Sequence, residues 1–183
     1  MKQIVTLLAG AALALLLPPA ATSAQQAAQA QAAQAFDPAQ VEAGMKLYKP
    51  TAADCELCHA WSGAGRYHDT PFSPVPAGGP SLVTSTMTRA QMIEMVTCGA
   101  LHYWGIMPRY RNDAWTPALR CHGKTRADIP DDEYPVIGMM QLTREQIEAV
   151  VTYVQAVYQG TGMSRDNCIK YWGAANARVC DVR

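Results

Sequence analysis

Residues 55–59 read Cys-Glu-Leu-Cys-His, and this five-residue pattern constrains the chain more than any other feature of the sequence. Two thiols three positions apart can each add across one vinyl group of a haem, and the imidazole that follows can reach the iron. The spacing therefore predicts one covalent c-type haem held by Cys55 and Cys58, with His59 as the proximal iron ligand. A zinc site would need a second Cys or His pair at short spacing, which the sequence lacks.

The N-terminus has the three parts of a secretory signal peptide. Lys2 gives a positive start, residues 4–17 are apolar, and residues 22–24 are small, as they are before a cleavage site. The apolar run is shorter than the roughly 20 residues that span a bilayer. We therefore expect residues 1–24 to be a cleaved signal peptide, and the mature chain to be a soluble periplasmic protein rather than a membrane-anchored one.

Charge is balanced along the chain, with 15 basic and 15 acidic residues. Removal of the signal peptide takes Lys2 with it and leaves the mature chain with one net negative charge. No run of like charge is long enough to indicate a polyanion or a membrane surface as a partner, and nothing in the composition suggests nucleic acid.

Six cysteines are present, and four remain after the two assigned to the haem. In an oxidising compartment these four are expected to pair, and three pairings are possible. We favour Cys98 with Cys121 and Cys168 with Cys180. Each of these bonds closes a local loop, and together they leave the N-terminal part of the chain to wrap the haem.

Three helices are predicted from caps and apolar spacing. The first covers about residues 38–48, after an Asp-Pro start; the second and third follow capping boxes at Thr88 and Thr143 and end near Gly99 and Gly160. No long segment alternates with a period of two, so the predicted fold class is all-α with long loops.

The chain divides by composition into a signal peptide, a linker, a domain and an extension. Residues 25–35 contain only Gln and Ala and predict a linker. Residues 36–160 suit one small domain whose apolar core includes the haem, and residues 161–183 form a C-terminal extension that the last cysteine pair staples.

The order of these features resembles the class I c-type cytochromes over residues 38–158. The residues that carry the resemblance are the haem motif, Gly44 and Tyr48 before it, Gly79-Pro80-Ser81-Leu82 after it, Met107-Pro108, and the helix of residues 142–158. The resemblance implies a class I cytochrome c fold around one haem c.

The resemblance also assigns contacts. Pro80 and Leu82 would contribute to cofactor binding, with the Pro80 carbonyl accepting from the second imidazole nitrogen of His59. The first and last helices would cross closely at Gly44, beside Tyr48 and Tyr153. The chain departs from small family members by insertions at residues 66–76 and 109–141.

Met107 is the preferred sixth ligand of the iron. Gly105 and Ile106 give a flexible approach, Pro108 commits the chain to an extended loop, and a thioether stabilises ferrous iron. Met139, Met140, His102 and His122 are the alternatives that the sequence leaves open, whereas Met92 and Met95 lie on a predicted helix and are expected in the core.

A haem iron with His59 and an axial methionine is saturated, which favours a single-electron carrier over an enzyme with substrate turnover. The expected partners are a periplasmic dehydrogenase, for instance a quinoprotein, or a respiratory complex or oxidase. Arg109 and Arg111 follow the ligand loop and could pair with a haem propionate or form a positive rim. The alternative function is a haem enzyme, or a gas or redox sensor, with a displaceable sixth ligand.

Overall fold

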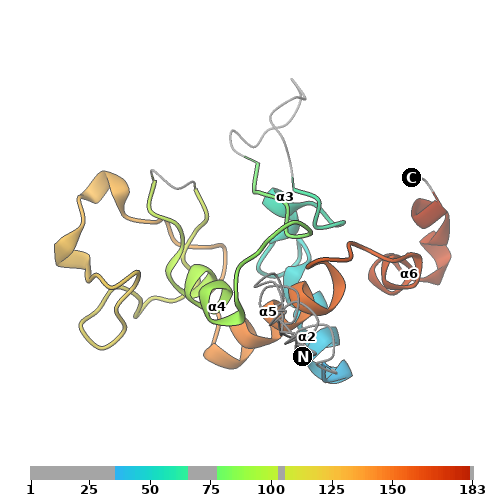
Figure 1. Ribbon diagram of the computed structural model, residues 1–183, viewed down its shortest axis with the longest axis horizontal. Coiled ribbons are helices and arrows are strands. Elements are labelled where there is room, and N and C mark those ends of the chain that lie inside the picture. Colours follow the sequence, from blue (N-terminus) through green and yellow to red (C-terminus); the bar gives the residue numbers. More distant parts are fainter. Residues whose placement is uncertain (1–35, 66–77, 103–105, 182–183) are drawn as a thin grey trace, which may run out of the picture. The chain divides into compact units, whose positions relative to one another are not determined.

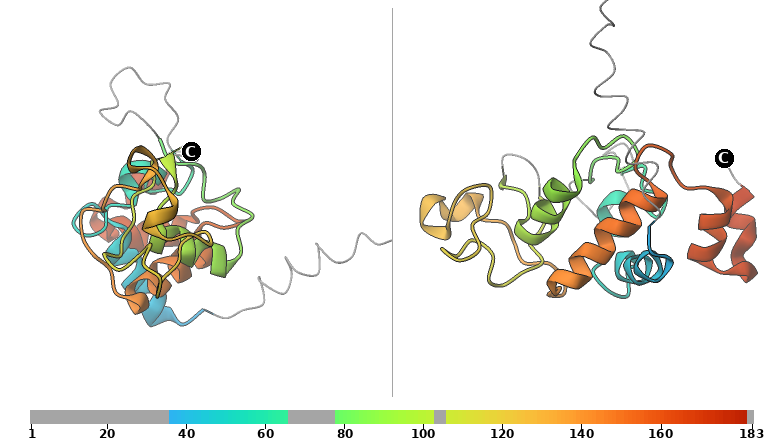
Figure 2. Two further views of the ribbon diagram at one scale, coloured as in Figure 1. Left: turned by 90° about the vertical axis from the view of Figure 1, so that its left-hand side faces the viewer. Right: turned by 60° about the horizontal axis from the view of Figure 1, so that its bottom comes forward.

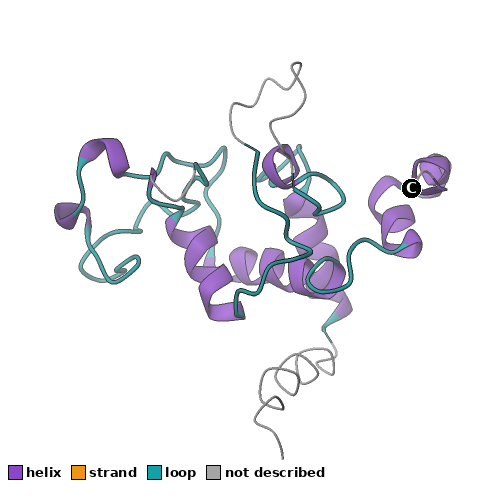
Figure 3. Cartoon of the chain, turned by 45° about the horizontal axis from the view of Figure 1, so that its top comes forward, coloured by secondary structure: helices purple, strands orange, loops and turns teal. Residues whose placement is uncertain are grey.

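The structure is a computed structural model that describes residues 36–65, 78–102 and 106–181. Within these ranges the chain forms α-helices and short 3-10 helices and no β-strand, which confirms the all-α prediction (Figure 3). Residues 36–183 form one compact unit. The predicted signal peptide, the Ala/Gln linker and the insertion at residues 66–76 lie outside the described residues, as does Gly105.

The three predicted helices form where the sequence placed them. They are α2 (Pro38–Tyr48), α4 (Arg89–Cys98) and α5 (Arg144–Val157). The Asp37 carboxylate accepts from the backbone N–H of Ala39, 2.9 Å away, and so caps α2. Complete capping boxes start the other two helices, in which Thr88 pairs with Gln91 and Thr143 with Gln146.

Helix α5 is central to the packing, because both α2 and α4 lie against it (Figures 1 and 2). The crossing of α2 and α5 depends on Gly44. A Cβ atom at this position would lie 2.0 Å from the carbonyl oxygen of Ala149 and 2.7 Å from the Cβ of Tyr153. Only glycine allows this approach, so the close crossing that the resemblance implied is present.

The main core surrounds this crossing and is rich in tyrosine. The rings of Tyr48, Tyr153 and Tyr158 lie within 5.5 Å of one another, centroid to centroid, and all three are buried. Tyr153 and Tyr158 also share a hydrogen bond of 2.9 Å between their hydroxyls. The hydroxyl of Tyr153 is therefore satisfied by Tyr158, while all three rings fill the core.

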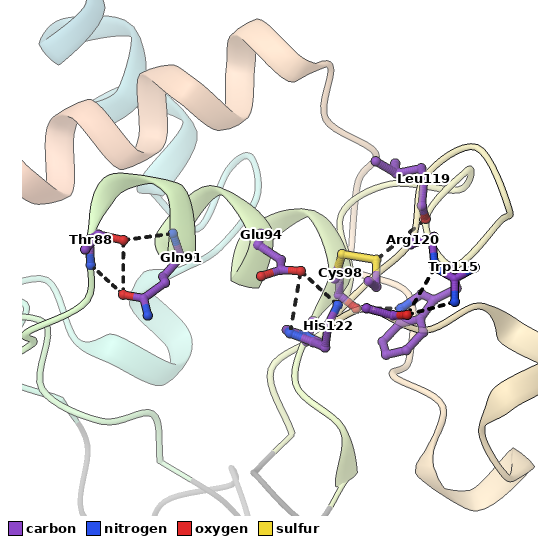
Figure 4. A network of polar contacts seen from close by, with 11 residues as sticks. Thr88, Gln91, Glu94, Cys98, Trp115, Leu119, Arg120 and His122 are labelled. Carbon is purple, nitrogen blue, oxygen red and sulfur yellow. Dashed lines mark hydrogen bonds and ion pairs between the residues drawn. A yellow bond between two sulfur atoms is a disulfide. The ribbon is translucent and has the colours of Figure 1, made fainter.

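A second apolar cluster holds the insertion of residues 109–141 against the end of α4. The predicted Cys98–Cys121 disulfide is confirmed, and the indole N–H of Trp115 donates to the carbonyl of Cys98, 2.9 Å away (Figure 4). His122 bonds to the Gly99 carbonyl through Nε2 at 2.9 Å, and its backbone N–H donates to Glu94. The insertion also contains the short 3-10 helices η2 (Arg126–Asp128) and η3 (Asp131–Glu133).

The C-terminal extension contains a helix that the sequence analysis did not predict. This helix, α6 (Arg165–Trp172), starts at Ser164, whose hydroxyl accepts from the N–H of Asn167, and η4 (Ala174–Asp181) follows it. The predicted Cys168–Cys180 disulfide joins the two helices and is confirmed. Among the described residues, no helix is both long and apolar enough to cross a membrane.

Candidate functional site

Residues 55–59, called the motif below, form one helical turn. Helix α3 (Glu56–His59) follows Cys55, and the His59 N–H donates to the carbonyl of Cys55 at 2.9 Å. Neither Cys55 nor Cys58 takes part in a disulfide, although the other four cysteines are all paired. Positions i and i+3 of a helical turn lie on one side, so the turn presents two sulfur atoms and an imidazole as one group.

The imidazole of His59 is held in a defined orientation. The side chain is buried, and its Nδ1 lies 2.8 Å from the carbonyl oxygen of Pro80, the contact that the resemblance implied. A carbonyl only accepts, so Nδ1 carries the proton and Nε2 keeps its lone pair. Burial lowers the pKa of His59, with the Pro80 bond opposing the shift. A neutral imidazole with Nε2 available is the form that binds a metal.

The segment from Gly79 to Leu82 runs beside the motif and has little room to move. The Gly79 N–H donates to the carbonyl of Cys58 at 2.8 Å, and that of Leu82 donates to Gly63 at the same distance. A Cβ on Gly79 would lie 2.9 Å from two ring atoms of His59. The backbone of this segment therefore contacts the imidazole directly and restricts its orientation. Leu82 packs against the main core.

Three buried tyrosines fix the backbone on both sides of the motif. Tyr48 donates to the carbonyl of Ala60 at 2.8 Å, and Tyr158 donates to that of Trp61 at 2.8 Å. On the other side, Tyr110 donates to the carbonyl of Ala53 at 2.9 Å. Burial raises the pKa of all three phenols, so each stays a neutral donor.

The residues that flank the motif have backbone conformations that L-amino acids rarely adopt. Asp54 has a φ of 56°, and Ala60 has a φ of 60° with a ψ of 157°. The Ala60 conformation belongs to a region that is essentially restricted to glycine. The tyrosine bonds described above act on the carbonyl of Ala60 itself and on the carbonyls of the residues next to Asp54 and Ala60, and they help to hold the strained backbone in place.

Met107 lies on a segment that hydrogen bonds connect to the motif. Its side chain is partly buried and packs against the main core, as do those of Cys55 and Leu82. The carbonyl of Met107 accepts from the N–H of Ala100 at 2.9 Å. Three residues further on, the hydroxyl of Tyr110 reaches Ala53, two positions before the first cysteine.

The alternative ligands differ in their surroundings. Met140 is partly buried and packs against the main core, whereas the side chain of Met139 is exposed. His102 is exposed, whereas the ring of His122 bonds to the Gly99 carbonyl and its backbone N–H donates to Glu94, which lie just after and within α4. Met92 is buried in α4, as expected for a core residue, whereas Met95 is only half-buried.

The two arginines that follow Met107, Arg109 and Arg111, have hydrogen-bond partners within the chain. The guanidinium of Arg109 donates to the carbonyl of Pro135 at 2.6 Å and stacks over Tyr134 at 4.5 Å. Arg111 pairs with Asp113 at 2.5 Å. Arg111 therefore has a carboxylate partner, whereas Arg109 is oriented by a carbonyl and a ring and has no carboxylate partner among the described residues.

The C-terminal extension contacts the motif, which the sequence did not reveal. The hydroxyl of Tyr171 donates to the carboxylate of Glu56 at 2.5 Å, and Trp172 packs edge-on against Trp61, with 5.9 Å between ring centroids. Trp172 Nε1 is buried without a hydrogen-bond partner among the described residues. The extension is therefore packed against α3 and against Trp61, which follows it.

No protein-family model, no curated protein and no solved structure matches this chain. Two cysteines outside any disulfide, an oriented neutral imidazole and a partly buried thioether on the same core form a donor set suited to a covalently held haem.

Proposed function

We propose that the chain is a class I c-type cytochrome with one haem c, and that it is exported to the periplasm as a soluble single-electron carrier. Cys55 and Cys58 would hold the haem by thioether bonds, and His59 and Met107 would be the axial ligands. The haem would supply a metal centre that changes oxidation state by one electron.

One observation carries this proposal: the pairing of His59 Nδ1 with the Pro80 carbonyl at 2.8 Å, across 21 residues of sequence. A histidine that only filled the core would gain nothing from sharing one helical turn with two cysteines that take part in no disulfide. A bond from Nδ1 to a carbonyl is the usual way in which proteins orient a metal-binding imidazole and increase its basicity.

The surroundings of the motif suit electron transfer. Tyr48, Tyr110 and Tyr158 fix the backbone around α3 through hydrogen bonds of 2.8 to 2.9 Å. A site fixed in this way changes little in geometry when the charge changes, which keeps reorganisation small. The expected donors and acceptors are a periplasmic dehydrogenase, such as a quinoprotein, and a respiratory complex or oxidase.

The ligand assignment can be tested by spectroscopy on the purified mature protein. Methionine ligation gives the oxidised protein a weak absorption band at the red edge, and Met107→Ala should abolish the band and lower the potential. Met139→Ala and Met140→Ala serve as matched controls and should keep it. Loss of the band in Met140→Ala alone would refute Met107 as the ligand.

The same samples separate a carrier from the alternative, a haem enzyme or sensor. A saturated iron must release its methionine before carbon monoxide can bind, so the reduced protein should react slowly. Rapid binding to the unaltered protein, or turnover of peroxide, would contradict the carrier function.

A further inference from the structure

Exposed apolar side chains gather around the Met107 segment. Among the described residues, six large hydrophobic side chains are exposed, and four of them belong to this region. These four form the apolar patch: Ile106, Val136, Ile137 and Met139, which are 42%, 67%, 49% and 73% exposed. Single exposed apolar residues are ordinary, but a group of them indicates an interaction surface.

Backbone hydrogen bonds bring the two parts of the apolar patch close together. The N–H of Arg109 donates to the carbonyl of Val136 at 2.9 Å, and that of Gly138 donates to the carbonyl of Arg109 at 2.8 Å. These bonds place residues 136–138 alongside the chain that leaves Met107. Ile106 and Val136 also line one cavity of about 50 Å³ with Met107.

Contacts of Tyr134 and Pro135 anchor the segment that carries the apolar patch. Pro135 is buried, and its carbonyl accepts from Arg109. The ring of Tyr134 lies between two guanidinium groups, those of Arg109 and Arg126, each 4.5 Å from its centroid. The apolar side chains are therefore held at the surface by a fixed backbone.

Negative charge lies next to the apolar patch along the chain. Helix η3, which ends two residues before Pro135, consists of Asp131, Asp132 and Glu133. Asp131 pairs with Arg126, but neither Asp132 nor Glu133 has an ion-pair partner among the residues that the structure describes. Arg111 is paired with Asp113, so Arg109 is the one nearby guanidinium without a carboxylate partner among the described residues, and the two carboxylates of this margin outnumber it.

We propose that the apolar patch and the acidic margin of Asp132 and Glu133 form a docking surface for a redox partner protein with an apolar centre and a rim of lysine or arginine. The proposal rests on the carrier function proposed above, and it adds the sign of the partner's charge. A partner seated on Ile106 and Val136 would lie against the side of the molecule that holds Met107. Electrostatic attraction of this kind mainly increases the rate of association.

The test uses the haem-containing protein and a defined probe, a mitochondrial-type cytochrome c with a lysine rim. Stopped-flow absorbance measures the second-order rate of electron exchange between the two proteins at increasing ionic strength. The rate should fall as salt is added, because salt screens the attraction. Asp132→Lys with Glu133→Lys should lower it about tenfold at low salt, and Val136→Ser with Met139→Ser should lower it at every ionic strength.

Matched controls lie in the C-terminal extension, where Asp166 and Val179 are also exposed. Asp166→Lys and Val179→Ser should leave the rate unchanged. Equal effects of the control and patch variants, or a rate that rises with salt, would overturn the docking surface. Self-association seen by sedimentation and abolished by Val136→Ser with Met139→Ser would also overturn it, since the patch would then bind a second copy.

The two proposals fail in different ways. An absorption spectrum without haem bands, recorded before any probe is added, would refute the carrier function. A haem-containing chain that exchanges electrons with hexacyanoferrate but is insensitive to the patch variants refutes the docking surface alone.

Discussion

Replacement of Ala60 by glycine should stabilise the protein, although glycine usually destabilises. Ala60 directly follows the candidate iron ligand and has a φ of 60° and a ψ of 157°. A non-glycine residue in such a region costs about 1 to 3 kcal/mol. Glycine removes this strain and adds about 0.4 to 1 kcal/mol of chain entropy to the unfolded state. The net expectation is a gain of about 1 kcal/mol in the free energy of unfolding.

The matched control is Ala43→Gly, in the exposed face of α2. A glycine in the middle of a helix destabilises by about 0.5 to 1 kcal/mol relative to alanine, so the two substitutions should have opposite signs. Guanidinium denaturation of both variants, followed by circular dichroism, measures the difference. The strain argument is refuted if Ala60→Gly lowers the free energy of unfolding as much as the control does.

Three further substitutions test contacts that place the site. Tyr110→Phe leaves a buried carbonyl without its donor and should reduce the free energy of unfolding by about 1 to 3 kcal/mol, whereas an unchanged denaturation midpoint would argue against this tether. Gly44→Ala would put a Cβ 2.0 Å from the carbonyl oxygen of Ala149 and should destabilise by about 3 kcal/mol or more; a thermal scan showing no loss would contradict the helix crossing. Cys98→Ser with Cys121→Ser opens a loop of 23 residues and should remove about 3 kcal/mol, measured against the oxidised parent under identical conditions.

Local signals in the sequence predicted the helices and the disulfides. The capping boxes at Thr88 and Thr143 gave the starts of α4 and α5, because the same few residues determine a helix start in any context. The two disulfides were predicted because short loops between cysteines are favoured.

Features that depend on distant residues were not predicted. Helix α6 has a weak apolar pattern, and its stability comes from the packing of Tyr171 and Trp172 against the motif more than 100 residues earlier in the chain. The tyrosine bonds to Ala53, Ala60 and Trp61 join segments 12 to 97 residues apart. A serine cap at Ser164 and a glycine at the end of α6 were the only local signals for that helix.

The pairing of surface charges was also not predicted from the sequence. Arg109 and Arg111 are close together in sequence and suggested a positive rim, but in the fold Arg111 pairs with Asp113, while Arg109 is held by the Pro135 carbonyl and the Tyr134 ring. Two of the three acidic residues of η3 have no ion-pair partner among the described residues, because Arg126 reaches only Asp131. The sign of a local surface therefore follows from pairing, which composition does not reveal.

The most direct test of the account is the mass of the mature protein, isolated after export from cells that attach haem to proteins. The account predicts a polypeptide that carries the mass of one haem after extraction with acidified organic solvent, because thioether bonds to Cys55 and Cys58 resist that treatment. Cys55→Ala with Cys58→Ala should yield the bare polypeptide, while Cys168→Ser with Cys180→Ser should keep the haem. Covalent haem on the Cys55→Ala, Cys58→Ala variant, or none on the unaltered chain, would contradict the central claim.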